Sequence, residues 1–216
     1  MSYEYVPRSE YTPVREILEE IIRKVQYHMK PEYTFQFVLI GSGRKKLITR
    51  EKGSNKGFDF DYNFVLQNVY EDYNEPVDIR QNFFNIIQEV SKDYGYKTED
   101  STTSITIKLV DQDNKKIVHS CDIAIVEEIE DENDVTSQWV YVRDKSKNKP
   151  SYTLRERPNS YRYNNKISDI EGAGLWNELR DEYLKIKNKN HDSNKKSFQL
   201  FIEAINNVYN RYEWNE

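Results

Sequence analysis

One stretch of sequence, residues 35–66, constrains the fold more than any other. An apolar run, FQFVLI, ends at a Gly-Ser-Gly triplet at residues 41–43, and a polar, basic loop leads from there into the run FDFDYNFVL. Glycines directly after an apolar run indicate a strand that ends in a turn. Side chains on a strand alternate between its two faces, so Asp59 and Asp61 share one face and aromatic rings occupy the other. The stretch therefore predicts two strands, the second with a buried aromatic face and a carboxylate pair opposite to it.

Two carboxylates held side by side on a strand repel one another unless a cation lies between them. Mg²⁺, or Mn²⁺ in its place, is the expected cation, because Mg²⁺ prefers oxygen ligands and is commonly held by one or two carboxylates together with substrate phosphates. A single D-x-D or Gly-Ser-Gly pattern is common, and either one alone is more often a structural feature. The two patterns in this order make a stronger case, and they predict a third carboxylate further along the chain.

That third carboxylate stands in another strand-like run, KIVHSCDIAIV, at residues 116–126. Asp122 has apolar neighbours there, and a buried carboxylate is costly unless it is paired or bound to a metal ion. On its own, Asp122 would be interpreted as a strand-end residue that faces water. Together with Asp59 and Asp61, it forms a candidate metal site with three carboxylate ligands.

These motifs, taken in order over residues 14–126, resemble the nucleotidyltransferase superfamily typified by DNA polymerase β. The loop is most similar to the branch of oligoadenylate synthases and bacterial cyclic-nucleotide synthases, in which Gly-Ser is followed by basic residues, a Thr and a Gly/Ser-rich segment. The corresponding residues here are Arg44, Lys45, Lys46, Thr49, Gly53 and Ser54. The gap from Ser42 to Asp59 is longer than in the smallest members, and Gly43 stands where many relatives carry a bulkier residue. These departures bear on the sub-branch rather than on the superfamily.

The resemblance implies a metal-dependent enzyme that moves a nucleoside monophosphate from a nucleoside triphosphate, with ATP as the expected nucleotide, to an acceptor hydroxyl, releasing pyrophosphate. The acceptor is left open between a small molecule, a nucleotide, a protein and an RNA end. Carried over by position, Asp59 and Asp61 would bind both metal ions, and Asp122 would bind the catalytic ion and help to deprotonate the acceptor. Gly41 and Ser42 would hold the β- and γ-phosphates. A basic residue would neutralise the triphosphate, and the candidates are Arg44, Lys45 and Lys46.

Two other classes of function remain open from the sequence. One is a nucleotide-binding regulator, such as a toxin–antitoxin component, that keeps the fold with little turnover; the intact set of three carboxylates favours the enzyme over this regulator. The other is an RNA-binding module that uses the segment 138–165, with the carboxylates incidental. The formal net charge of −5 disfavours this module and argues against binding of bulk duplex DNA.

Length bounds the organisation of the chain, and the resemblance implies its fold. With 216 residues, we expect one domain or two small lobes. The resemblance implies an α+β fold with a small mixed or antiparallel sheet flanked by helices, the nucleotidyltransferase fold, and a C-terminal helical lobe. Residues 1–135 are expected to form the catalytic domain, and residues 136–216 a basic and aromatic loop with a helical lobe packed on that domain. A single cysteine, no N-terminal signal sequence and no apolar run of membrane-spanning length predict a cytoplasmic protein without a membrane partner.

Apolar spacing predicts the elements of the N-terminal half. Residues 1–12 are expected to form an irregular arm that ends at Pro13, and an amphipathic helix of about 16 residues follows. A second helix is expected over residues 78–94, ahead of a hairpin whose strands span residues 104–110 and 116–126. The second strand of this hairpin carries the third carboxylate.

Charge divides the C-terminal half into an acidic run, a basic segment and a helical tail. The acidic run at 127–134 is expected to end the sheet as a solvated linker. The segment 138–165 is expected to be a poorly structured loop that lines the nucleotide or acceptor site if it folds over the carboxylates, since cations and aromatic rings bind phosphates and bases. Its cations and tyrosines are Arg143, Lys145, Lys147, Lys149, Tyr152, Arg155, Arg157, Tyr161, Arg162 and Tyr163. Two apolar stripes at helical spacing, from Leu175 and from Phe198, predict two helices in the tail.

Overall fold

The structure is a computed structural model, and it describes residues 2–69, 76–132, 136–147, 149–157, 163–192, 194–212 and 214. The chain divides into two compact units. The sheet unit comprises Val6–Ile48 and Ser54–Arg157, and it contains the large sheet. The helical unit comprises Met1–Tyr5, Thr49–Gly53 and Pro158–Glu216, and it contains the C-terminal helices.

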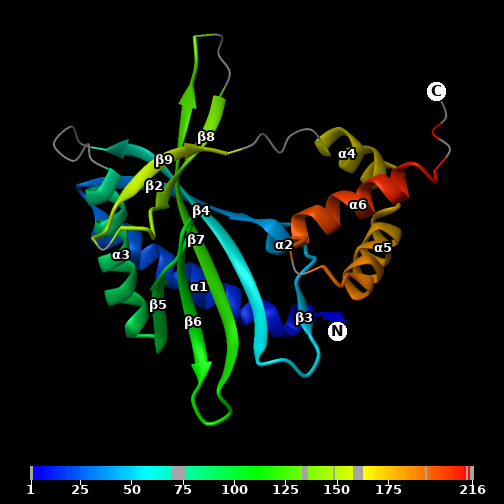
Figure 1. Cartoon of the computed structure of the whole chain (residues 1–216), viewed down its shortest axis with the longest axis horizontal. Helices are drawn as coiled ribbons and strands as arrows, with labels where there is room; N and C mark the ends of the chain where they lie inside the picture. The colour runs from blue at the N-terminus through cyan, green and yellow to red at the C-terminus, as the bar shows by residue number, and fades with distance from the viewer. Residues whose placement is uncertain are drawn as a thin grey trace. The chain divides into compact units, whose positions relative to one another are not determined.

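The sheet unit is built on a mixed sheet in which β2, β4, β7, β6 and β5 lie side by side in that order (Figure 1). These five strands span Tyr33–Ile40, Lys56–Val69, Lys116–Glu130, Ile105–Asp111 and Tyr96–Asp100. Next to β7 lies β8, Thr136–Arg143, and β9, Tyr152–Glu156, pairs with β8. Strands β4 and β7 are parallel, and the other pairs in this sheet are antiparallel. The α+β class with a mixed sheet is therefore confirmed.

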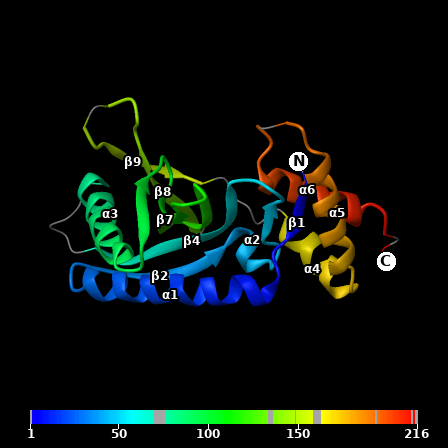
Figure 2. The same cartoon turned by 90° about the horizontal axis from the view of Figure 1, so that it is seen from below.

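Two helices, α1 (Arg8–Met29) and α3 (Pro76–Lys92), pack on each other against one face of this sheet (Figure 2). Their apolar stripes and the aromatic face of β4 form one hydrophobic core. All four aromatic residues of that face are buried, and they are Phe58, Phe60, Tyr62 and Phe64. Burying a side chain of this kind contributes roughly 1.5–3 kcal/mol. The predicted assignment of faces is confirmed, so Asp59 and Asp61 lie on the face away from this core.

The first helix begins earlier than the sequence predicts. It starts at Arg8, directly after Pro7, and continues through Pro13. A helical N–H bonds to the carbonyl four residues before it, so Pro13 leaves only the carbonyl of Ser9 without its helical donor. Ser9 is exposed, and its carbonyl can be hydrated. A proline in this second turn is therefore tolerated, and the expectation that the arm runs to Pro13 is wrong.

The sheet also continues past its predicted end. Strand β7 runs to Glu130, so residues 127–130 pair with β8 instead of forming a linker. The two strands project as a ribbon beyond the neighbouring strands (Figure 1). Much of the segment predicted as a basic loop forms β8 and β9, and residues 136–157 belong to the sheet unit, whereas the sequence predicts a division after residue 135. Tyr161 and Arg162 of that segment lie outside the described residues.

Alternation explains why β8 forms in spite of the cations around it. Its valines, Val140 and Val142, pack with Val65, Ala124 and Val126 in a small second core. Tyr141, between the two valines, points to the main core instead. Packing on both faces stabilises this strand by more than the flanking charges destabilise it. The alternating apolar side chains therefore decide the structure here, and the basic composition that predicts a loop does not.

The helical unit contains α4 (Asn164–Gly172), α5 (Trp176–Lys189) and α6 (Ser197–Tyr209), and its α5 and α6 confirm the two helices predicted for the tail. Its strands β1 and β3, Tyr3–Tyr5 and Thr49–Glu51, pair antiparallel. The arm therefore includes a strand, contrary to the prediction of irregular structure. None of the helices in the described part of the chain has the length and apolar character needed to cross a membrane.

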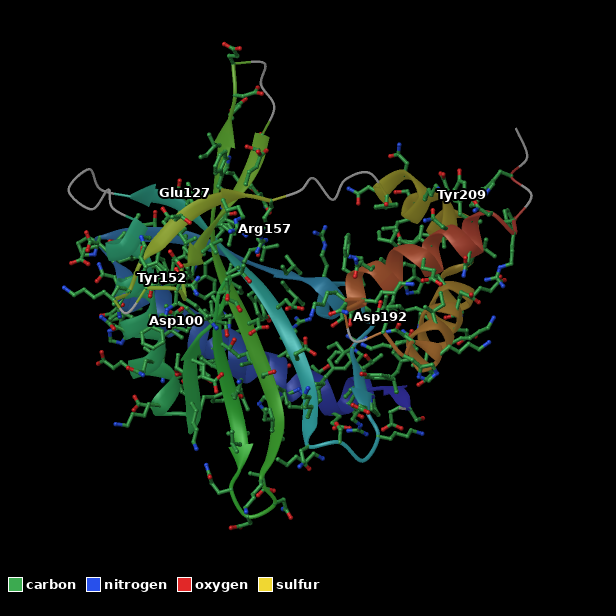
Figure 3. All side chains as sticks on the ribbon, in the orientation of Figure 1. Asp100, Glu127, Tyr152, Arg157, Asp192 and Tyr209 are labelled. Carbon is green, nitrogen blue, oxygen red and sulfur yellow. The ribbon has the colours of Figure 1, made fainter. Side chains whose placement is uncertain are left out.

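A buried ion pair in the sheet unit connects α3, β5, β8 and β9. The guanidinium of Arg80 is fully buried and donates to Asp100 Oδ1 at 2.8 Å and to the Tyr141 carbonyl at 3.2 Å. Oδ2 of Asp100 accepts from the Tyr152 hydroxyl at 2.7 Å and lies 3.2 Å from the Arg143 guanidinium (Figure 3). Because Arg143 lies on β8 and Tyr152 on β9, one carboxylate fixes both strands to the core.

Replacing this carboxylate should destabilise the sheet unit. We predict that Asp100→Asn lowers the free energy of unfolding by about 3–5 kcal/mol, because it leaves the buried Arg80 without its counter-charge. Urea denaturation followed by circular dichroism measures the loss. Asp93→Asn removes an exposed carboxylate and serves as the matched control, with an expected change within about 0.5 kcal/mol. Small and equal losses in the two variants would contradict the role given to the ion pair.

Candidate active site

The parallel pairing of β4 and β7 brings the predicted carboxylates together. Asp61 is paired with Asp122, and Asp59 is paired with Ser120. Residues in register on neighbouring strands point to the same face of a sheet. The three carboxylates therefore lie together on the face of the sheet that is turned away from the aromatic core.

The carboxylates of this face interact electrostatically. Asp59 is exposed, whereas Asp61 and Asp122 are half-buried. Burial, and then the negative charges of Asp59 and Asp122, raise the pKa of Asp61 to about 7. A bound cation would relieve the repulsion that contributes to this shift.

Asp122 is oriented by the neighbouring strand β6. Thr106 is paired with Asp122, and its hydroxyl donates to Asp122 Oδ1. Thr106 is buried, so this hydrogen bond holds the carboxylate in one orientation. Thr106 is not among the site residues predicted from the sequence. The signal that could have done so is its polar position between Ile105 and Ile107 on a predicted strand.

The glycine turn lies directly against the carboxylates. Ile40, the last residue of β2, is paired with Asp61. Gly41 follows with a φ of +60°, and a Cβ at this position would lie 2.5 Å from Asp61 Oδ2. Only glycine allows the backbone both this conformation and this close approach. A short helix, α2, spans Gly41–Arg44 at this turn and includes Ser42.

The three predicted basic residues of the loop differ in their surroundings. Arg44 and Lys46 are exposed, and Lys45 is half-buried. Burial, and then the charge of Arg44, lower the pKa of Lys45. Lys46 has a φ of +56° and lies in a turn in which its N–H donates to the Gly43 carbonyl at 3.2 Å. Lys45 is thus the one cation of the three that is partly withdrawn from water.

The structure adds two residues to this face, Asn63 and Arg157. Asn63 lies two residues after Asp61 on β4, and its exposed fraction is only 4%. Arg157 directly follows β9, and its Nη1 donates to Asn63 Oδ1 at 3.0 Å (Figure 3). The positive charge of Arg157 lowers the pKa of Asp61, against the effect of the other carboxylates. Arg157 belongs to the predicted basic segment but not to the predicted site residues, and Asn63 is not predicted at all.

The oxygen ligands on this face suit a metal ion that arrives with its substrate. Within the ranges that the structure describes, no three His, Cys, Asp or Glu side chains converge closely enough to hold a metal ion by themselves. Mg²⁺ is usually bound by one or two carboxylates, with waters and substrate phosphates as the other ligands. The adjacent Asp61 and Asp122, with Asp59 beside them, supply carboxylates of that kind. The donor set therefore fits Mg²⁺ or Mn²⁺ bound together with phosphates, and not a preformed protein cage.

The fold is shared with solved structures of a bacterial cyclic AMP-GMP synthase. The chain is similar to Vibrio cholerae DncV, described as a prokaryotic cGAS homolog, with a TM-score of 0.58 and 15% identity over 85% of this chain and 47% of that one. It is similar to Escherichia coli DncV in its 3′-deoxy GTP bound form, with a TM-score of 0.57 and 15% identity over 98% and 55% of the two chains. A third structure, Vibrio cholerae DncV in complex with the linear intermediate 5′ pppA(3′,5′)pG, has a TM-score of 0.56 and 13% identity over 85% and 47%.

These likenesses establish the fold of the chain. The chain shares the nucleotidyltransferase fold of these structures, as the order of its motifs predicts. The chain spans about half the length of these proteins. No family model and no curated sequence matches it.

The raised pKa of Asp61 predicts how its replacement changes stability with pH. The folded protein binds the proton of Asp61 more tightly than the unfolded chain, so the stability contributed by this group falls as the pH rises from 3.8 to about 7. We expect Asp61→Asn to melt higher than the parent at pH 8 without metal, by about 2–4 °C for each 1 kcal/mol of relief. The gain should shrink on acidification and vanish near the lower end of that range.

Thermal melts of the metal-free proteins across the pH range measure this effect. Asp93→Asn removes an exposed carboxylate and should follow the parent at every pH. An Asp61→Asn variant that melts well below the parent at pH 8 would show that the carboxylate stabilises the fold, and the account of mutual repulsion would be wrong.

Proposed function

We propose that this chain carries the catalytic site of a metal-dependent nucleotidyltransferase, which moves a nucleoside monophosphate from a nucleoside triphosphate to an acceptor hydroxyl. The observation that carries the proposal is the register of β4 and β7, which sets Asp61 beside Asp122 in a sheet with the polymerase β-like fold. Clustered carboxylates repel one another and so cost stability in the absence of a cation. A cluster of this kind is better explained by a ligand than by folding.

The carboxylates would hold the metal, Mg²⁺ or Mn²⁺. Asp59 and Asp61 come from one strand and Asp122 from the next, so a rigid sheet fixes the spacing of the ligands. When bound, two such ions neutralise the phosphate charge and stabilise the attacking and leaving oxygens.

Other residues of the chain would position the triphosphate. The backbone of Gly41 passes close to Asp61 because no side chain intervenes. The amides of Gly41 and Ser42, with the Ser42 hydroxyl, would hold the β- and γ-phosphates at this point. Lys45 is our choice among the basic residues for neutralising the triphosphate, because it is partly withdrawn from water and a cation acts more strongly there.

Asp122 would act as the base for the acceptor. Thr106 holds Oδ1 of this carboxylate, and Oδ2 would receive the proton of the acceptor hydroxyl. The acceptor oxygen forms its bond to the α-phosphorus while the bond from the α-phosphorus to the bridging oxygen breaks, and pyrophosphate leaves. We propose ATP as the donor and a second nucleotide as the first acceptor to test, since the structural neighbours are named as a cyclic AMP-GMP synthase.

A nucleotide-binding regulator with little turnover is the second candidate. It rests on the same pairing of Asp61 with Asp122, because a metal-bound triphosphate would complete this carboxylate cluster whether or not it reacts. The two candidates differ in a measurable way, because both bind a nucleoside triphosphate and only the enzyme releases pyrophosphate from it.

The assay combines the protein with Mg²⁺ and α-labelled nucleoside triphosphates, singly and in pairs, and follows pyrophosphate release and labelled products. We predict that Asp122→Asn lowers the rate by at least about 100-fold, the usual contribution of a general base. Its affinity for the triphosphate should change little, because Asp59 and Asp61 remain. Asp113→Asn, in the exposed turn between β6 and β7, is the matched control and should keep the parental rate.

The outcomes separate the candidates. Parental turnover in Asp122→Asn would refute its role as the base. A parent that binds nucleotide and metal tightly but releases no pyrophosphate with any pair of nucleotides would favour the regulator.

A further inference from the structure

We propose that Arg157 is a phosphate-binding residue of this site. The proposal rests on the proposed function, because it takes the ligand of the carboxylate face to be a metal-bound nucleoside triphosphate. It adds to the site a cation from outside the glycine turn and its loop.

Arg157 is fixed at its backbone and at its side chain. Its backbone N–H donates to the Gln138 carbonyl of β8 at 2.7 Å. Its Nη1 donates to Oδ1 of the buried Asn63 at 3.0 Å. Asn63 lies two residues from Asp61 on the same face of β4, so this hydrogen bond holds the guanidinium on the carboxylate face, where it interacts electrostatically with Asp61.

The chemistry of Arg157 fits a phosphate. Its hydrogen-bond partner is a neutral amide, and among the described residues this is the one hydrogen bond that its guanidinium makes, so the side chain keeps its charge and most of its N–H donors. A planar guanidinium matches the oxygens of a phosphate with two parallel hydrogen bonds. The side chain is half-buried, and charge-assisted hydrogen bonds are stronger where water is partly excluded.

The position of Arg157 depends on the short strand before it, β9, whose first residue is held by a hydrogen bond. β9 has five residues and pairs with β8. At its first residue, the Tyr152 hydroxyl donates to Asp100, which is itself held by the fully buried Arg80. A buried ion pair adds little net stability compared with an apolar core, but it fixes geometry. This network therefore fixes one end of β9, and Asn63 fixes the side chain that follows the other end.

Isothermal titration calorimetry with Mg²⁺ and a non-hydrolysable α,β-methylene analogue of ATP tests the proposal. We expect Arg157→Gln to weaken binding at least about tenfold, the effect of losing about 1.4 kcal/mol. Arg157→Lys keeps a point charge but loses the planar fork, so its affinity should lie between those of Arg157→Gln and the parent. Lys145→Gln removes an exposed cation after β8 and serves as the matched control, with parental affinity expected.

A second titration, with Mg²⁺ and tripolyphosphate, asks whether Arg157 contacts phosphate or the nucleoside. Loss of a phosphate contact should lower the affinity for the ATP analogue and for tripolyphosphate by a similar factor. Weakened binding of the nucleotide analogue with unchanged binding of tripolyphosphate would overturn the phosphate assignment. Melting temperatures of all variants, measured without ligand, show whether each variant is folded, and Arg157→Lys keeps the test decisive if Arg157→Gln unfolds.

The outcomes distinguish this proposal from the proposed function. If the parent binds neither ligand with Mg²⁺, the proposed function fails. If the parent binds the analogue and Asp61→Asn does not, while Arg157→Gln binds as tightly as the Lys145→Gln control, the role of Arg157 is refuted and the proposed function stands.

Discussion

The site depends on the parallel pairing of two strands that are far apart in the sequence. The register that places Asp61 beside Asp122 also sets Phe60 beside Cys121 in the core. Gly57 permits this pairing, because a Cβ at its position would lie 1.8 Å from the Val118 carbonyl oxygen. A shift of one residue would turn the carboxylates of β4 towards the core and its aromatic rings towards solvent. Burial of the aromatic face of β4 therefore stabilises the register that the site needs, because a wrong register would expose that face to water.

Strand β4 combines opposite energetic contributions on its two faces. Its aromatic side chains are buried against α1 and α3 and stabilise the fold. Its carboxylates repel one another, and the raised pKa of Asp61 records that cost together with the cost of burial. Arg157 offsets part of this repulsion from the far end of β9. The burial of the aromatic face thus compensates for the unfavourable interactions on the carboxylate face. This arrangement is common where residues are placed for a ligand rather than for folding.

Sequence patterns predict the parts of the site that depend on local alternation. The shared face of Asp59 and Asp61, the buried rings that alternate with them and the strand that carries Asp122 all follow from a period of two. Contacts between segments that are distant in the sequence do not follow from this period. The contacts of Thr106 with Asp122 and of Arg157 with Asn63 are examples. Strands β8 and β9 are mistaken for a loop because flanking lysines and arginines dominate the composition, while the packing of Val140 and Val142 decides the structure. The early start of α1 is missed because a proline near a helix start costs only one hydrogen bond.

We propose that Asp61 and Asp122 together form a metal site that is completed by a nucleotide. Equilibrium dialysis with radioactive Mn²⁺, with and without the methylene analogue of ATP, measures the metal retained by the protein. The account predicts that the parent retains more Mn²⁺ when the analogue is present and that the double variant Asp61→Asn, Asp122→Asn loses this nucleotide-dependent increment. A folded double variant that retains as much Mn²⁺ as the parent in the presence of the analogue would contradict the account.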